Sequence, residues 1–407
     1  MDRRKLLGAA ALAVPAIAGV TLLSEARHDG GVSAPSAAVS EGVSSDAEDA
    51  AGQALMPTVV PNAAPPVIGV QFHGTWDMYW NGTTPNSMFA THLDVLAAQG
   101  VQVIRLDVGW SSGQPTNATP DPNQWYHKRL STVIDAVRAR GMQIFVTVHQ
   151  SPSWARPNTG SEVKQYPTDP SLIKPWLTFI AATYGAKLLA IEVWNEPNLV
   201  DFTQIADVTQ RAAKYVPVLK AAYAAIKAGR SSLPVIQAGP SQTDDGFVRD
   251  CYVAGSKGYF DILGVHPYQG NQTKPPESTD ITGKARMTNM PAIIALMAQY
   301  GDAAKPIWWT EFGVSVHAND AVPAGQVWLY GVPDDETAAS YIGRAYNLAW
   351  QQWPQVKLAV TYCSYKTPSD SLGHQYGYRI LEADGAVKPQ LSALNAIRKA
   401  YGAAQKL

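Results

Sequence analysis

From residue 67 onward, short apolar runs alternate along the chain with longer segments whose apolar residues recur at helical spacing. Eight of these runs have the length of buried strands. They are Val67–Phe72, Val101–Asp107, Gln143–His149, Leu188–Trp194, Val235–Ala238, Asp261–His266, Ile307–Glu311 and Lys357–Tyr362. Runs that are apolar throughout, rather than at every second residue, predict parallel strands covered on both faces.

The segments between these runs predict amphipathic helices. Two apolar stripes show the helical spacing: Leu130, Val133, Ile134 and Val137 in one segment, and Tyr215, Leu219, Ala222 and Ile226 in another. Eight strand–helix units predict a single α/β domain, a (β/α)8 barrel. A doubly wound sheet is the alternative fold, but no glycine-rich phosphate turn follows the first strand.

The beginning of the chain has the layout of an export signal. Arg3, Arg4 and Lys5 precede an apolar run that ends at Leu23. The adjacent arginines resemble a twin-arginine signal, which exports folded proteins. The run is only as long as the shortest membrane spans, so residues 1–27 are either a signal peptide or a retained membrane anchor. In both cases we expect the rest of the chain to lie outside the cytoplasm.

Residues 28–66 consist mainly of Ala, Ser, Gly, Pro and acidic residues and contain no aromatic residue. Such a segment cannot bury enough apolar surface to offset its ordering entropy, which predicts a disordered linker. The first aromatic residue of the chain is Phe72. We therefore expect one folded domain over residues 67–407.

Composition excludes some functions. The chain has 32 Lys and Arg against 33 Asp and Glu, and only 16% of its residues are charged. It therefore offers no basic face for a nucleic acid. Its two cysteines, Cys251 and Cys363, have no metal or redox spacing, and we expect two buried thiols.

Polar and ionisable residues gather where the predicted strands end. Six of the eight strands end in this way, with His73, Arg105, His149, Glu196, His266 and Glu311. Because the carboxyl ends of barrel strands meet at one mouth, where barrel enzymes carry their chemistry, this pattern predicts an active site.

Two carboxylates dominate this set. Glu196 ends the fourth strand and Glu311 the seventh, on opposite sides of the mouth. A pair of carboxylates can divide the work of glycoside cleavage, one donating a proton and the other remaining ionised. The alternative for each is a structural role, as a helix cap or as the partner of a surface arginine.

Four motifs carry a resemblance to a known family. The segment Trp194–Asn198 is similar to the Asn-Glu-Pro signature of retaining glycoside hydrolases of clan A, and Trp308–Gly313 resembles the strand-seven nucleophile motif of that clan. Ser151–Ala155 and Val387–Pro389 resemble family 39, with a family 5-like cellulase as the other possibility.

The resemblance implies a role for each matched residue. Glu196 would be the acid/base and Glu311 the nucleophile, without a metal or cofactor. Arg105 and Tyr268 would donate hydrogen bonds to Glu311, and Asn195 would bind the sugar 2-OH.

Three other polar residues are candidates for substrate binding, namely His73, His149 and His266. For His149 and His266 a contact with sugar hydroxyls, with neighbouring carboxylates or a structural role remains open. Arg105 has an alternative too, because Glu192 lies on the same strand face as Glu196 and needs a buried partner.

Aromatic residues beyond the strand ends are candidate sugar platforms. We expect two of five to line the site, from Trp76, Trp110, Trp154, Trp328 and Tyr330, and we select Trp110 and Trp154. One position departs from clan A. The eighth strand ends with Tyr362 or Tyr365 where the clan has a tryptophan, so the family's substrates do not transfer safely.

The sequence therefore predicts an exported, monomeric, retaining glycosidase that acts on a poly- or oligosaccharide. The linker would tether it near the cell surface, which suggests a substrate in the cell envelope. A metal-dependent barrel hydrolase is one alternative, because three strands end in histidine, but the first strand offers only one, His73. A non-catalytic carbohydrate-binding barrel is the other, although it would be expected to have lost Glu196 or Glu311.

Overall fold

A computed structural model of the chain describes residues 64–157, 163–369 and 371–402. The predicted export or anchor segment, residues 1–27, lies outside the described residues, as does nearly all of the predicted linker over residues 28–66. Among the described residues, no helix combines the length and apolar character needed to cross a membrane.

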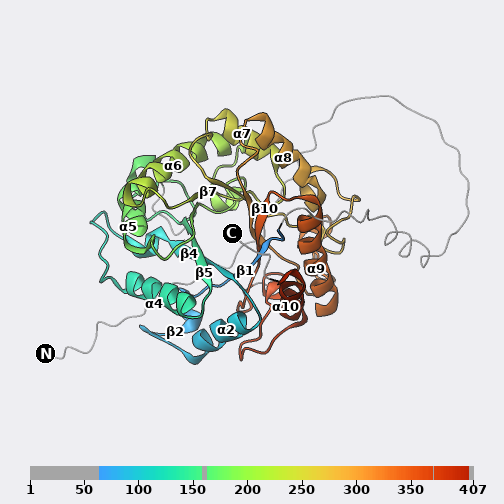
Figure 1. The fold of residues 1–407 in the computed structure, drawn as a ribbon. Coiled ribbons are helices and arrows are strands. Elements are labelled where there is room, and N and C mark those ends of the chain that lie inside the picture. The colour runs from blue at the N-terminus through green and yellow to red at the C-terminus, as the bar shows by residue number, and fades with distance from the viewer. Residues whose placement is uncertain (1–63, 158–162, 370, 403–407) are drawn as a thin grey trace, which may run out of the picture. The chain divides into compact units, whose positions relative to one another are not determined.

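Eight parallel strands close into a barrel in the order β1-β10-β9-β8-β7-β6-β5-β4 (Figure 1). They are β1 (Val67–Gln71), β4 (Val103–Gly109), β5 (Gln143–His149), β6 (Ile191–Val193), β7 (Val235–Gln237), β8 (Ile262–Val265), β9 (Ile307–Phe312) and β10 (Val356–Thr361). Every predicted strand is present, with ends within three residues of the expected ones. The predicted (β/α)8 fold is confirmed.

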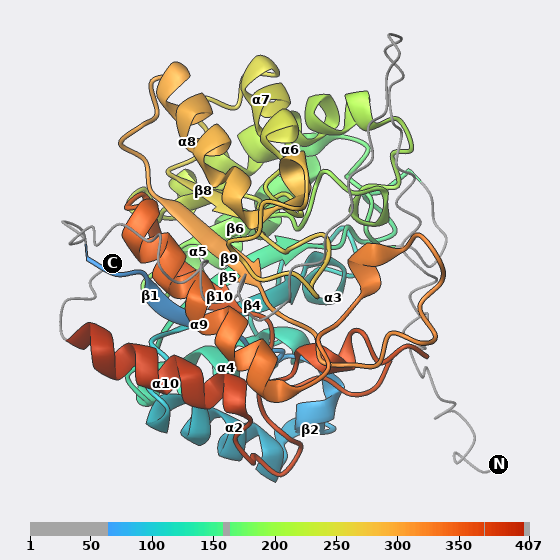
Figure 2. The same ribbon diagram turned by 90° about the vertical axis from the view of Figure 1, so that its right-hand side faces the viewer.

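One long helix follows each barrel strand, and these helices surround the sheet (Figures 1 and 2). They are α2 (Ser87–Ala98), α4 (Trp125–Ala139), α5 (Lys174–Tyr184), α6 (Val208–Gly229), α7 (Asp245–Val253), α8 (Met290–Gln299), α9 (Asp335–Gln352) and α10 (Pro389–Tyr401). The two apolar stripes seen in the sequence are the buried faces of α4 and α6.

Short elements lie in the loops. A hairpin of β2 (Trp80–Asn81) and β3 (Thr84–Pro85) follows β1, and the short helix α3 (Trp110–Gly113) follows β4. Single turns of 3-10 helix are found at Asp77–Tyr79, Pro170–Ile173, Val200–Phe202, Gly283–Ala285, Met287–Asn289, Val327–Leu329 and Tyr376–Tyr378.

The barrel interior begins with an apolar layer, which we call the plug. It consists of Val67, Val103, Phe145, Ala190, Ile236, Ile262, Trp308, Leu358 and Val360. A separate and larger apolar core fills the space between strands and helices. The free thiols of Cys251 and Cys363 are buried, as expected.

Polar residues replace apolar ones immediately above the plug. Two residues after Val103, Phe145 and Ala190 come Arg105, Thr147 and Glu192. Because side chains on a strand alternate between its faces, these three also point into the barrel, and all are buried. Beyond these three residues, the inward-facing positions belong to the residues at the mouth of the barrel.

Candidate active site

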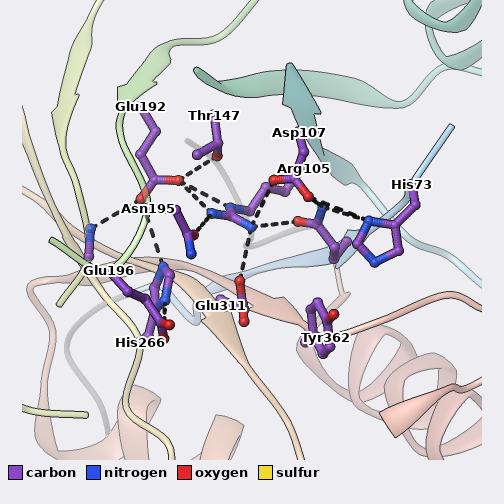
Figure 3. A network of polar contacts seen from close by, with 12 residues as sticks. His73, Arg105, Asp107, Thr147, Glu192, Asn195, Glu196, His266, Glu311 and Tyr362 are labelled. Atoms are coloured by element: carbon purple, nitrogen blue, oxygen red, sulfur yellow. Dashed lines mark hydrogen bonds and ion pairs between the residues drawn. The ribbon is translucent and has the colours of Figure 1, made fainter. Parts of the chain in front are cut away.

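Arg105 lies at the centre of the polar layer and is almost fully buried. Its Nε and Nη2 both lie 3.1 Å from Glu192 Oε2, and Nη2 donates to Asn195 Oδ1 at 2.7 Å. Its Nη1 donates to Gln71 Oε1 at 2.8 Å and to Glu311 Oε2 at 3.0 Å (Figure 3). Both roles that the sequence left open for Arg105 are therefore present, since it pairs with Glu192 and also holds Glu311.

Glu192 has no exposed surface and a complete set of donors. Thr147 Oγ1 donates to it at 2.6 Å and the Gly239 backbone N–H at 3.2 Å. Burial alone would raise the pKa of Glu192, but the charges of Arg105 and His266 and the hydrogen bond from Thr147 lower it to about 2. Glu192 is thus a permanent buried anion that fixes Arg105.

The backbone after β6 turns sharply to aim Glu196 at the mouth. Trp194 has φ 82° and Glu196 has φ 41°, values that non-glycine residues rarely adopt. The buried Trp194 indole donates to the carbonyl of Phe202 at 2.7 Å and anchors the turn. Glu196 Oε1 in turn accepts a hydrogen bond from His266 Nδ1 at 3.2 Å.

Glu311 reaches the interior through an irregularity in β9. Between the residue pairs at Trp309 and Phe312, β9 contains one residue more than its neighbour β10. Trp309 and Phe312 both pack in the outer core, and the extra residue lets Glu311 point inward between them. There Tyr268 OH donates to Glu311 Oε1 at 2.7 Å.

Glu196, His266 and Glu311 form one cluster, in which one ligand atom of each lies within 4.8 Å of the others. Burial alone would lower the pKa of His266, but Glu311, Glu192 and Glu196 raise it to about 9. At neutral pH the ring is therefore an imidazolium, which does not bind cations. No other group of three potential metal ligands occurs in the described part of the chain, and His73 and His149 are not in this one.

The ionisation of Glu311 depends on its neighbours. Burial raises the pKa of Glu311, and the charge of Glu196 acts in the same direction, so that the carboxyl titrates above its usual range. The charges of His266 and Arg105 and the hydrogen bond from Tyr268 oppose this rise. These two charges and the hydrogen bond from Tyr268 are what favours the carboxylate form that a nucleophile needs.

A third carboxylate, Asp107, lies on the opposite side of Arg105 from Glu192 and Glu196 (Figure 3). Its Oδ2 accepts from Gln71 Nε2 at 3.1 Å and lies 3.5 Å from His73 Nδ1. We did not select Asp107 or Gln71 from the sequence. Alternation would have found Asp107, because it follows Arg105 by two residues on the same strand face.

The expected sugar contacts are placed as follows. His149 ends β5 and is buried, and burial lowers its pKa to about 4, so the ring is neutral. Trp110 has no exposed surface and packs edge-on against Trp154 at 5.6 Å. Trp154 is only half-buried. A direct sugar contact stays a prediction for all three, and only Trp154 already presents an aromatic surface.

The strand-eight alternative is resolved in favour of Tyr362. Its ring packs edge-on against His73 and Tyr378, at 5.7 and 5.5 Å, and its hydroxyl accepts a hydrogen bond from Lys366 at 3.0 Å. Tyr365 instead packs against His92. Of the two tyrosines, Tyr362 is therefore the one that lies beside His73.

The sequence model of the cellulase family, glycosyl hydrolase family 5, matches residues 63–354. The chain belongs to this family. The resemblance to clan A that the motifs carried is thereby confirmed. Within the barrel, Glu196 follows the end of β6 and Glu311 lies near the end of β9. No curated protein sequence matches the chain.

Solved structures share the barrel. A family 39 glycoside hydrolase from the gut symbiont Bacteroides cellulosilyticus WH2 is 20% identical (TM-score 0.59), and the match covers 84% of this chain and 65% of that one, just under two thirds. GH5_18 from Streptomyces cattleya, solved with GlcNAc, is 18% identical with a TM-score of 0.60, and the match covers 84% of this chain and 81% of that one. A GH39 β-xylosidase from Caulobacter crescentus is 19% identical with a TM-score of 0.55, and the match covers 84% of this chain and 72% of that one. At such identities these likenesses show the fold.

Proposed function

We propose that this family 5 barrel is a retaining glycosidase that hydrolyses O-glycosidic bonds of a poly- or oligosaccharide. The observation that carries the proposal is the short separation of the two carboxylates, since an oxygen of Glu196 and an oxygen of Glu311 lie within 4.8 Å. Carboxyl groups about 5–5.5 Å apart are typical of retaining enzymes, whereas inverting enzymes need about 6.5–9.5 Å to admit a water.

The reaction proceeds in two displacements. Glu311 attacks the anomeric carbon, the bond to the leaving oxygen breaks, and Glu196 gives its proton to that oxygen. The ionised Glu196 then takes a proton from water while the water oxygen attacks the same carbon and releases Glu311. One water is consumed, and both carboxyl groups return to their starting forms.

Neighbouring residues support these steps. Arg105 and Tyr268 hold Glu311 with one oxygen each, which orients it for attack. Asn195 Oδ1 is fixed by Arg105, and its Nδ2 makes no hydrogen bond to the described residues, which leaves it available to the sugar 2-OH. His266 donates to Glu196, and this contact orients the Glu196 carboxyl group beside Glu311.

We also propose that the enzyme is exported by the twin-arginine route and acts outside the cytoplasm. The support is the basic start of the chain, Arg3, Arg4 and Lys5, before an apolar run. Replacing Arg3 and Arg4 by Lys in the full chain should keep the activity inside the cell. Unchanged export of this variant would overturn the proposed route.

A glycan panel read by product mass tests the function. We expect the wild-type protein to cleave at least one glycan, Glu311→Gln to cleave none, and Glu336→Gln, a matched exposed change on α9, to behave as wild type.

Azide tests the acid/base role of Glu196. It should restore the turnover of Glu196→Ala on an aryl glycoside, and a β-glycoside should give a β-glycosyl azide as product. Wild-type binding without cleavage would favour a carbohydrate-binding barrel, and an α-azide would overturn retention.

A further inference from the structure

Asp107 is partly exposed to solvent, as are the two glutamates. The exposed fractions of the side chains are 18% for Asp107, 13% for Glu311 and 12% for Glu196. Arg105 Nη1 lies 3.0 Å from a Glu311 oxygen and 3.5 Å from an Asp107 oxygen. These oxygens are therefore at most 6.5 Å apart, a separation that one sugar ring can bridge.

The contacts of Asp107 differ from those of a purely structural carboxylate. Glu192 has no exposed surface, and its contacts to Arg105, Thr147 and Gly239 are 3.2 Å or shorter. Asp107 is partly exposed, and two of its three contacts are as long as 3.5 Å. Because a carboxylate offers about four acceptor sites, Asp107 keeps capacity for further donors.

The surroundings of Asp107 keep it charged. Although burial opposes it, the hydrogen bond from His73 and the charge of Arg105 hold the pKa of Asp107 far below its usual range. His73 adds a second polar group, because its buried Nε2 has no partner among the described residues. The His73 ring stacks at 4.0 Å on Trp76, whose indole is 40% exposed.

We propose that Asp107 determines the specificity of the sugar-binding subsite beside the nucleophile. Its carboxylate accepts hydrogen bonds from free hydroxyl groups of the sugar that becomes attached to Glu311, with His73 Nε2 accepting another. This proposal rests on the proposed function and narrows it. The substrate presents a neutral sugar with free hydroxyls here, and a uronic acid is rejected because its charge would face Asp107.

A double-mutant cycle between enzyme and substrate tests this proposal. The parent substrate is whichever 4-nitrophenyl β-glycoside of glucose, xylose or mannose the wild-type protein cleaves fastest, compared with its monodeoxy analogues. For at least one analogue we expect wild-type kcat/KM to fall about 10- to 100-fold. Asp107→Asn should lose a similar factor on the parent and almost none in addition on that analogue.

A structural role for Asp107 predicts a different result. Asp107→Asn would then slow the parent and all deoxy analogues by one common factor, and that outcome overturns the proposal. The proposal also predicts that kcat/KM for 4-nitrophenyl β-glucuronide, divided by kcat/KM for the β-glucoside, rises in Asp107→Asn. An unchanged ratio would contradict the proposal. Asp135→Asn on α4, an exposed matched change, should match wild type throughout.

Two controls separate this proposal from the proposed function. Absence of aryl glycoside cleavage, or cleavage retained by Glu311→Gln, overturns the glycosidase proposal and this one with it. Cleavage that requires Glu311 but shows no coupling to Asp107 overturns this proposal alone. If Asp107→Asn does not fold, Asp107→Glu keeps the charge for Arg105 and Gln71 but moves it by one methylene, and the same cycle applies.

Discussion

The plug and the polar layer above it are built from the same strands in opposite ways. Phe145 and Thr147 share the inner face of β5 and are both fully buried, as are Val103 and Arg105 on β4. Each fully buried apolar side chain contributes roughly 1.5–3 kcal/mol to folding. Buried ion pairs contribute little net stability, because desolvation offsets their attraction. The plug, which stabilises the barrel, and the polar layer, which carries the reacting groups, are thus only two positions apart along each strand.

The strongest test of this division removes the central cation. Arg105→Met leaves Glu192 and Glu311 without their partner and should lower the free energy of unfolding by about 3–5 kcal/mol, and kcat/KM by about 10²–10³-fold. The double variant with Glu192→Met should recover most of the stability in urea denaturation but none of the activity. Recovery of activity in the double variant would contradict the division.

The opposite change lies in the plug. Phe145→Ala should lower the free energy of unfolding by about 3–5 kcal/mol through cavity formation. Because Phe145 touches none of the reacting groups, kcat/KM of the folded variant at 20 °C should stay within about threefold of wild type. A much larger loss of activity would show that the plug positions the polar layer.

Two histidines in the polar layer should make the stability of the protein depend on pH in opposite directions. The pKa of His266 is raised from 6.5 to about 9, so its stabilisation is complete below pH 6.5 and is lost as pH rises toward 9. The pKa of His149 is lowered to about 4, so stability is lost as pH falls from 6.5 toward 4. Urea midpoints against pH should show both limbs, and His266→Gln should flatten only the alkaline one.

The smallest effect expected is that of metal removal. The imidazolium of His266 occupies the place of a cation between two carboxylates. Dialysis against EDTA should therefore leave kcat/KM and the thermal midpoint unchanged. A loss that zinc or magnesium restores would favour the metal-dependent alternative.

The sequence predicted most of the fold, because eight apolar runs and helical stripes are local patterns. It also located Glu196 and Glu311 at strand ends. It could not show how Glu311 turns inward, since strict alternation from Trp308 would not place both Trp309 and Phe312 outside. That orientation depends on the pairing of β9 with β10, a property of two distant segments. The double role of Arg105 has the same origin, because its partners outside β4 come from three other strands or their ends, β1, β6 and β9.

Gly239 illustrates a different kind of constraint. It contributes only a backbone N–H to Glu192, yet a Cβ there would lie 2.5 Å from the His266 ring and 2.9 Å from Thr310. In a library that randomises the mouth of the barrel to select new sugar preferences, only glycine should be recovered at this position. Asp107 and Trp76 are both partly exposed, so the same library should recover several residue types at these two positions.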